Sequence, residues 1–311
     1  MKKKIFIDGR AGTTGLRIYD RLQGREDLEL ILLSEEERKD TAARKRALNE
    51  ADAAFLCLPD DAAREAVSLV ENPNTVIIDT STAHRTLEGW TYGFPELSEE
   101  HEAAVRTSRR IAVPGCHAGG FIALIYPLIQ KGILPPDALL TCHSLTGYSG
   151  GGKKMIAEYE TDELPPLLGA PRQYGITQQH KHLKEMKAIT GLSEFPLFSP
   201  IVGDFYSGMQ VTVPLFRSQL AKGMTAEDIK RAYREQYTGP IVTYRDCADR
   251  QGFLETATLS GKDSMTVTVA GNDDRILLVA LYDNLGKGAS GAALECLNLV
   301  LGLEKSRGLE L

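Results

Sequence analysis

The chain opens with Lys4-Ile5-Phe6-Ile7-Asp8, continues as Gly9-Arg10-Ala11-Gly12-Thr13-Thr14-Gly15, and then places apolar residues at Leu16, Ile18, Tyr19 and Leu22. The first run is typical of a buried strand, and the last has the spacing of an amphipathic helix. A strand, a glycine turn and a helix in this order are typical of dinucleotide-binding folds, where the helix N-terminus favours a pyrophosphate. The glycine spacing, G-x-x-G-x-x-G, is a variant of the usual fingerprint. We expect six residues of this turn to contact a dinucleotide: Gly9, Arg10, Gly12, Thr13, Thr14 and Gly15.

Strand and helix patterns alternate through the rest of the first hundred residues. Such alternation predicts a Rossmann-like, doubly wound parallel sheet with right-handed crossovers, an α/β fold. The expected elements are a strand at 28–33, a helix at 42–49, a strand at 53–58, a helix at 60–70 and a strand at 75–79.

After residue 116 the pattern changes to one apolar helix followed by long strand-like runs. The helix is expected at 120–131 and the runs at 139–146, 209–216, 264–270 and 276–282. These predict an α+β domain with a mixed or antiparallel sheet, and a last helix at 289–303 that returns to the first domain. We therefore expect a nucleotide-binding domain from 1–115 and 286–311, and a catalytic and oligomerisation domain from 116–285.

Composition limits the possible classes of protein. The 311 residues exceed the usual size of one core, are 42% hydrophobic and 25% charged, and carry a net charge of −6. This balance does not favour a nucleic-acid partner, and no apolar run reaches the roughly 18 residues needed to cross a bilayer. We expect a cytoplasmic protein with reduced thiols, because the start shows no export signal and the five cysteines form no C-x-x-C pair.

The segment after the second strand bears on the choice of cofactor. Ser34, Arg38 and Lys39 could hold the 2′-phosphate of NADP, whereas the glutamates at 35–37 would oppose it unless they face solvent. The sequence favours NADP, and the alternative is a solvated charged turn.

Cys116 is the candidate nucleophile. It follows the strand-like residues 111–113 and a Pro-Gly turn, and it stands at a helix start, where the dipole and free N–H groups favour the thiolate. His180 and His182 are the best candidates for an acid-base partner, with His84 and His117 as competitors. Two histidines two residues apart could also suggest a metal, but no further ligand stands at a suitable spacing, so we expect none.

Arg85 follows the strand at 75–79, at the edge where open α/β sheets bind ligands. Its guanidinium could fork onto a phosphate, or it could form a surface ion pair. The glycine-rich segment 147–152 resembles an anion-binding loop but lacks the Walker A spacing, so a nucleoside-triphosphate site is not predicted.

Taken together, these segments resemble the short form of the N-acetyl-gamma-glutamyl-phosphate reductase family, within the group that includes aspartate-semialdehyde dehydrogenases. The matching blocks span nearly the whole chain in order. They are Asp8 to Gly15, Cys57 to Ala66, Ser81 to Arg85, Pro114-Gly115-Cys116, Gly147 to Lys153, His180-Lys181-His182 and Asp283 to Ala292.

The resemblance implies NADPH-dependent reduction of an acyl phosphate of a small molecule, through a thioester on Cys116, by a homo-oligomer, dimer or tetramer. It makes one of the two histidines His180 and His182 the acid-base residue. It implies that the substrate is held by Arg85, Ser81, Gly119 and Lys181. The resemblance also adds four residues to those expected to bind the cofactor: Pro59, Ser149, Gly150 and Asn284.

Two positions depart from the family pattern: Val113 stands where the family usually has Asn, and residues 117–120 lack a Thr often found there. A missing side-chain hydrogen bond is expected to affect the rate more than the reaction. Two alternatives remain, a related reductase of aspartyl or glyceraldehyde phosphate, and a nucleotide-binding redox regulator in which Cys116 senses oxidants.

Overall fold

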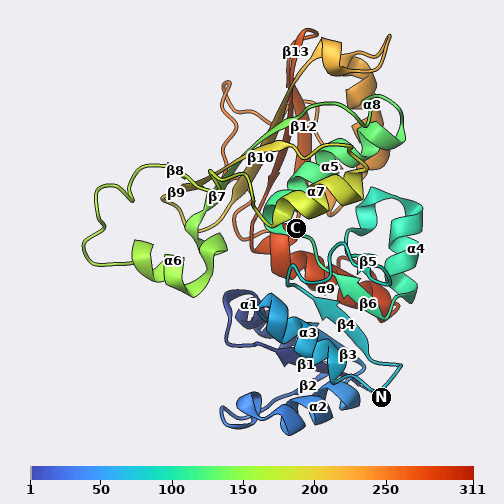
Figure 1. The fold of residues 1–311 in the computed structure, drawn as a ribbon, viewed down its shortest axis with the longest axis vertical. Helices are drawn as coiled ribbons and strands as arrows, with labels where there is room; N and C mark the ends of the chain where they lie inside the picture. Colours follow the sequence, from blue (N-terminus) through green and yellow to red (C-terminus); the bar gives the residue numbers. More distant parts are fainter. Residues whose placement is uncertain (1) are drawn as a thin grey trace. The chain divides into compact units, whose positions relative to one another are not determined.

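The computed structural model describes residues 2–311, which form two compact units (Figure 1). Unit 1 contains the chain up to Pro95, then Glu99–Pro114 and Ala289–Leu309. Unit 2 contains Glu96–Ser98, Gly115–Gly288 and Glu310–Leu311.

Unit 1 is built on a six-stranded sheet in the order β2-β1-β3-β4-β6-β5, with every neighbouring pair parallel. The Rossmann-like sheet expected from the sequence is therefore present. Its strands are β1 (Lys3–Asp8), β2 (Leu28–Ile31), β3 (Ala53–Leu56), β4 (Val76–Asp79), β5 (Thr91–Tyr92) and β6 (Arg110–Ala112). Its helices are α1 (Thr13–Leu22), α2 (Thr41–Glu50), α3 (Asp60–Ser68), α4 (Glu99–Thr107) and α9 (Gly291–Val300).

Alternate residues of β1, β3 and β4 enter two different cores. Ile5 and Ile7 of β1 pack with α1, α4 and α9 on one face, whereas Phe6 packs with α2 and α3 on the other. A parallel sheet covered on both faces needs apolar residues at successive strand positions, which explains the continuous apolar runs. The last helix, α9, contributes to the first of these cores, so the chain does return to the nucleotide-binding fold.

Unit 2 is built on a seven-stranded mixed sheet in the order β11-β12-β13-β10-β7-β9-β8. Its strands are β7 (Thr141–Gly147), β8 (Arg172–Gln173), β9 (Leu197–Gly203), β10 (Met209–Phe216), β11 (Val242–Tyr244), β12 (Met265–Gly271) and β13 (Arg275–Tyr282). Its helices are α5 (Cys116–Gln130), α6 (Gly152–Tyr159), α7 (His182–Thr190) and α8 (Ala226–Gln236).

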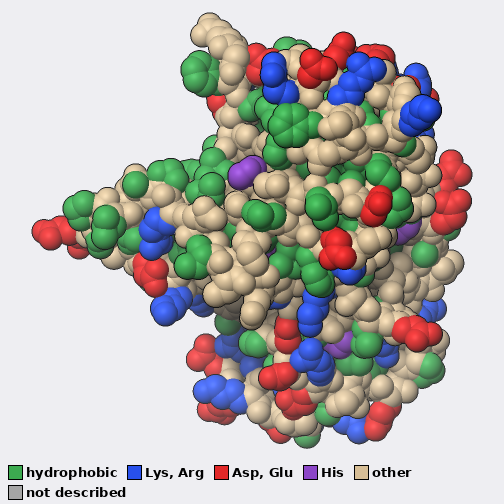
Figure 2. Space-filling model, turned by 45° about the horizontal axis from the view of Figure 1, so that its top comes forward, with side chains coloured by type: hydrophobic (Ala, Val, Ile, Leu, Met, Phe, Trp, Pro, Cys, Tyr) green, Lys and Arg blue, Asp and Glu red, His purple; other side chains and the backbone are tan. Residues whose placement is uncertain are grey.

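The two faces of the unit 2 sheet differ. Helix α5 packs on β10 and β13 and contacts α7 and α8, so these helices bury one face. On the other face, exposed apolar side chains occur at Leu197, Phe216 and Leu277. An arm of unit 2 that contains α6 and residues 160–171 extends from the end of β7 (Figure 1). Figure 2 shows hydrophobic and charged side chains together on its surface, and Leu167 there is 82% exposed.

The helix expected at 120–131 begins earlier, at Cys116. The apolar run alone indicates a start at 120, whereas the Pro-Gly turn indicates a helix start at Cys116, and α5 begins where the turn indicates. Gly120 is required there, since a Cβ would lie 2.5 Å from the hydroxyl of Tyr282. No helix within residues 2–311 is long and apolar enough to span a membrane.

Candidate active site

The glycine turn of unit 1 lies between β1 and α1, and its three glycines have different roles. Gly9 has a φ of +85°, and a Cβ on it would lie 2.2 Å from the carbonyl oxygen of Cys57. A Cβ on Gly15 would lie 2.5 Å from the carbonyl oxygen of Gly9. On Gly12, the N-cap of α1, a Cβ would make only ordinary contact, with its nearest atom 3.4 Å away. The packing thus requires glycine at positions 9 and 15, whereas protein atoms leave room for a side chain at position 12.

A cavity of about 440 Å³ opens beside this turn. Its charged lining residues are Asp8, Arg10, Glu35, Arg38, Lys39 and Arg44. Four cations therefore face two carboxylates, an arrangement that fits the phosphate of a nucleotide. Arg38 and Lys39, which the sequence suggested for the 2′-phosphate, line this cavity. Ser34 does not, because it is exposed and its hydroxyl accepts a hydrogen bond from the backbone N–H of Glu37.

Arg44 and Asp8 form a buried pair in the same cavity, and sequence reasoning missed both. The Nε of Arg44 donates to Asp8 Oδ2 at 3.0 Å, and the two side chains are 11% and 7% exposed. Burial raises the pKa of Asp8, although the charge and hydrogen bond of Arg44 act in the opposite direction. Arg44 is carried by α2, which the sequence pattern predicted but could not orient toward β1.

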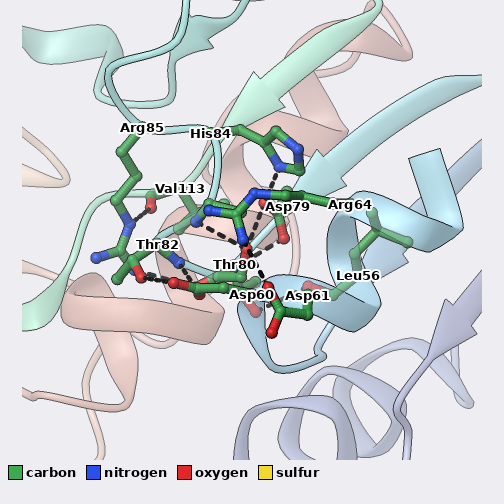
Figure 3. Close-up of polar contacts among 12 residues, drawn as sticks. Leu56, Asp60, Asp61, Arg64, Asp79, Thr80, Thr82, His84, Arg85 and Val113 are labelled. Carbon is green, nitrogen blue, oxygen red and sulfur yellow. Dashed lines mark hydrogen bonds and ion pairs between the residues drawn. The ribbon is translucent and has the colours of Figure 1, made fainter. Parts of the chain in front are cut away.

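The turn after β4 is ordered by the buried carboxylate of Asp79 (Figure 3). Asp79 accepts hydrogen bonds from the backbone N–H of Ser81 at 2.9 Å and from its hydroxyl at 2.6 Å. The Nδ1 of His84 lies 2.6 Å from the same carboxylate, and its ring stacks on Trp90. The hydroxyl of Ser81, expected to contact substrate, is thus bound within the turn and 7% exposed. His84, a competitor for the catalytic role, is likewise engaged in holding this turn.

Arg85 follows this turn and is also held by backbone groups (Figure 3). Its Nε donates to the carbonyl oxygen of Val113 at 2.8 Å, and its Nη2 donates to that of Thr80 at 3.0 Å. Val113 lies three residues before Cys116 in the chain, so Arg85 fixes the backbone that leads to the cysteine. The guanidinium is therefore oriented by the protein itself.

Cys116 is the first residue of α5, directly after the N-cap Gly115. The thiol is partly exposed, and the N-terminal end of this fifteen-residue helix stabilises a thiolate. The carbonyl of Cys116 accepts a hydrogen bond from the hydroxyl of Tyr282 at 2.5 Å, and the backbone N–H of Gly115 donates to Glu185 Oε2 at 3.1 Å. These contacts fix the first turn of the helix around the sulfur.

The other cysteines contrast with Cys116. Burial raises the pKa of Cys57 to about 12 and raises that of Cys142 further. The hydrogen bond from Cys247 to Asp249 raises the pKa of Cys247 as well, and Cys296 is a buried residue of α9. A thiolate is the reactive form of cysteine, so these environments disfavour Cys57, Cys142 and Cys247 as nucleophiles.

A cavity of about 210 Å³ in unit 2 surrounds Cys116. It is lined by the two histidines expected from the sequence, together with Lys181, His117 and Tyr174. Its other lining residues are Thr146, Gly147, Gly150, Gly151, Met155 and Val202. Among residues 2–311, no group of histidine, cysteine or acidic side chains is arranged to hold a metal ion.

His117 is buried and joins two hydroxyl groups. Its Nδ1 lies 2.7 Å from the Oγ of Ser144, and its Nε2 lies 2.6 Å from the phenol oxygen of Tyr174. Burial, with a smaller effect of His180, lowers the pKa of His117 to about 3, so its ring is neutral. Burial and the neighbouring Cys116 raise the pKa of Tyr174, which therefore keeps its proton beside the thiol. Sequence reasoning missed Tyr174, because only the tertiary structure brings it to His117.

His180 and His182 occupy different surroundings within the cavity. The backbone N–H of His182 donates to the Nδ1 of His180 at 3.2 Å, so the neutral ring of His180 carries its proton on Nε2. His182 is the first residue of α7, and its Nε2 lies 4.0 Å from Glu185 Oε1. The rings of the two histidines meet edge to face, with centroids 4.7 Å apart.

The remaining expected residues lie in both units. Gly150 lines the cavity at Cys116, whereas Ser149 is buried and its hydroxyl accepts from the amide of Asn284 at 3.0 Å. The amide oxygen of Asn284 accepts from the backbone N–H of Gly208. Gly119 is buried inside α5, with its N–H bonded to the carbonyl of Gly115. In unit 1, Pro59 is the exposed N-cap of α3, and Thr13 and Thr14 begin α1.

Comparison with known proteins places this fold and site in a class. Residues 4–105 match the family described as "Semialdehyde dehydrogenase, NAD binding domain", and residues 116–284 match "Semialdehyde dehydrogenase, dimerisation domain". Among solved structures, aspartate semialdehyde dehydrogenase II of Vibrio cholerae has the same fold, with a TM-score of 0.74 and 18% identity. That comparison covers 97% of this chain and 99% of the other.

Closer relatives identify the family within this class. A protein of Sinorhizobium medicae named N-acetyl-gamma-glutamyl-phosphate reductase is 49% identical over 97% of this chain and 99% of its own length. The N-acetyl-gamma-glutamyl-phosphate reductase 2 of Nostoc is 45% identical over 99% of both chains. The chain belongs to the N-acetyl-gamma-glutamyl-phosphate reductase family.

Proposed function

We propose that this chain reduces N-acetyl-gamma-glutamyl phosphate with NADPH, giving N-acetylglutamate 5-semialdehyde and phosphate in arginine biosynthesis. The observation that carries the mechanism is the position of Cys116, at the start of α5 in a cavity lined by His180, His182 and Tyr174. The names of the close relatives support the choice of substrate.

The first step is an acyl transfer. The thiolate of Cys116 attacks the gamma-carbonyl carbon, a C–S bond forms, and the bond from carbon to the phosphate oxygen breaks. Phosphate leaves with its electron pair, and a thioester remains on the enzyme. The free N–H groups in the first turn of α5 are suited to stabilise the developing oxyanion.

The second step converts the thioester to an aldehyde. NADPH supplies a hydride for the carbonyl carbon when it is bound. The C–S bond then breaks, and the cysteine sulfur leaves as a thiolate or is protonated. We assign the proton donor in this step to His180 or His182, each of which lines the cavity with Cys116.

The cation-lined cavity of unit 1 is the proposed site of the NADP phosphates. Arg38, Lys39 and Arg44 would bind the 2′-phosphate, and the turn at Gly12 would bind the pyrophosphate. The other expected cofactor residues, Arg10, Thr13, Thr14 and Pro59, belong to the same unit. Ser149, Gly150 and Asn284 are proposed contacts of the reacting end of the cofactor.

The substrate phosphate is assigned to Arg85, whose guanidinium is already oriented by two carbonyl groups. Lys181 lines the cavity at Cys116 and is the proposed partner of a substrate carboxylate. We further propose a cytoplasmic homo-oligomer, because one match is to a dimerisation domain and one face of the unit 2 sheet exposes apolar side chains.

A reverse assay tests this function. N-acetylglutamate semialdehyde, inorganic phosphate and NADP are mixed with the protein while the absorbance of reduced cofactor is followed. We expect turnover that depends on all three components and is faster with NADP than with NAD. Turnover with aspartate semialdehyde in place of the acetylated substrate, and none with the latter, would assign the chain to the related reductase instead.

A further inference from the structure

The loop between β8 and α7 carries both Tyr174 and His180, and it is held to the sheet by a side chain. Main-chain pairing with β9 joins Arg172 to Val202 and Gln173 to Ile201, and the N–H of Tyr174 then donates to the carbonyl of Pro200 at 3.0 Å. At Gly175, with a φ of +61°, the main chain turns. The loop beyond this point needs another connection if it is to remain on β9.

Gln178 supplies that connection. Its Nε2 donates to the carbonyl oxygen of Phe198 at 2.7 Å, and its Oε1 accepts from the backbone N–H of Phe198 at 2.9 Å. One carboxamide thus satisfies both backbone groups of a strand residue, as a neighbouring strand would. The Gln178 side chain therefore continues the hydrogen bonding to β9 beyond the point where the backbone of β8 ends its pairing.

The backbone of Gln178 is in an unfavourable conformation. Its φ is +55°, and within residues 2–311 only Gln251 among the other non-glycine residues also has a positive φ. A non-glycine side chain in this region crowds the backbone, so the conformation is unfavourable unless other contacts stabilise it. The two hydrogen bonds to Phe198 provide this stabilisation, so the conformation directs the carboxamide onto β9.

Phe198 connects this contact to the catalytic rings. Its ring is buried and lies edge-on to His180, at 5.1 Å between centroids, and to His117, at 5.3 Å. Gly175, which forms the turn closed by the N–H of Gln178, lies against both Pro200 and His180. The loop is therefore fixed at Tyr174, at Gln178 and at the ring of His180.

We propose that Gln178 is a positioning residue, whose carboxamide holds His180 and Tyr174 in the orientation used at Cys116. The proposal rests on the proposed function for its kinetic consequence and on these contacts for its structural one. Gln178 itself lines no part of the cavity at Cys116.

Two variants separate the side chain from the backbone. Gln178→Ala removes the carboxamide, and Gln178→Gly removes it while also relieving the positive φ. We expect both to lower kcat in the reverse assay by about tenfold, within the range known for small misplacements of catalytic groups. The KM for NADP should stay level, and Gln179→Ala is the control, because Gln179 is an exposed neighbour of the same type.

Imidazole nitrogen NMR provides a readout that does not depend on turnover. In the wild-type protein His180 should show an Nδ1 acceptor and a protonated Nε2, with its signal identified by His180→Asn. In Gln178→Gly this pattern should shift toward that of a free imidazole.

The value of kcat and the His180 signal together distinguish the positioning role of Gln178 from the proposed reductase function. Wild-type kcat in both variants with an unchanged His180 signal would overturn the positioning role. Wild-type kcat in Gln178→Gly alone would show that only the backbone matters, which also overturns it. A shifted His180 signal in a protein without reductase activity would instead reject the proposed function and retain the positioning role.

Discussion

The chemistry proposed here depends on one sulfur atom, that of Cys116 at the start of α5. Cys116→Ser should reduce turnover by more than the 10²-fold typical of a single catalytic group, because a hydroxyl is far less ionised than this thiol. NADP affinity, measured by calorimetry, should be unchanged. Cys247→Ser is the control, since Cys247 is exposed. More than about a tenth of wild-type activity in Cys116→Ser would contradict the thioester mechanism.

His117 predicts how stability varies with pH. Its pKa is about 3 in the folded protein and near 6.5 in an unfolded chain, so between these values the unfolded state binds more protons. The contribution of His117 to stability is therefore complete above pH 6.5 and is lost as the pH falls toward 3. His117→Gln cannot titrate and should reduce the loss of the urea midpoint between pH 7.5 and 4.5.

A substitution at Gly12 distinguishes an effect on cofactor binding from an effect on protein packing. Since a Cβ there meets no protein atom closer than 3.4 Å, Gly12→Val should barely change unfolding. Its side chain would collide with the pyrophosphate, so the KM for NADP should rise steeply. Gly24→Val is the matched control, because a Cβ on Gly24 meets nothing within 4 Å. An unchanged NADP affinity in Gly12→Val would contradict the assignment of the nucleotide to this turn.

At the scale of elements, the turn after β4 orients Arg85 through the carbonyls of Val113 and Thr80. Arg85→Lys keeps the charge but loses the planar fork, at about 1.5–3 kcal/mol for each charged hydrogen bond lost. The KM for phosphate in the reverse assay should rise, while alkylation of Cys116 by iodoacetamide stays near the wild-type rate. Arg64→Lys, in an exposed pair with Asp61, is the control.

The opposite pattern in Arg85→Lys would give Arg85 a different role. A level phosphate KM with slower alkylation would mean that Arg85 acts on the thiolate through the backbone at Val113. The phosphate site would then have to be sought near Lys153 or Lys181.

The elements of unit 1 were largely predictable from the sequence, whereas strands β8, β9 and β11 and helices α6 to α8 of unit 2 were not predicted. The alternation of strand and helix patterns predicted the parallel sheet, and in the structure Ile5 and Phe6 enter cores on its opposite faces. Cys116 was predicted at a helix start by the Pro-Gly turn before it. Tyr174 and Arg44 could not be predicted, since their partners His117 and Asp8 lie 57 and 36 residues away in the chain. The hydrogen bonds from Gln178 to Phe198 of β9 could likewise be found only from the tertiary structure.

At the scale of the whole molecule, the open face of the unit 2 sheet predicts self-association. Leu277 and Pro214 are paired across β13 and β10, and their face also exposes Phe216 and Leu197. Sheets with one uncovered apolar face commonly pack against another surface. Leu277→Glu should therefore lower the mass measured by light scattering, whereas Phe253→Glu, at an exposed turn, should not. A monomeric wild-type protein would contradict this prediction.

Because α9 is made last, one core of unit 1 cannot be completed until synthesis of the chain is nearly finished. Residues Ala293, Leu294 and Leu297 of α9 lie in the core that also contains Ile5 and Ile111. A ribosome that has made the chain up to Ala112 has made the strands of unit 1 but not α9, which completes the core on one face of their sheet. This core of unit 1 is complete only when almost the entire chain has been made, and until then only α1 and α4 can cover that face of the sheet. A message truncated before residue 289 would yield a protein that lacks part of the core on which its first strand depends.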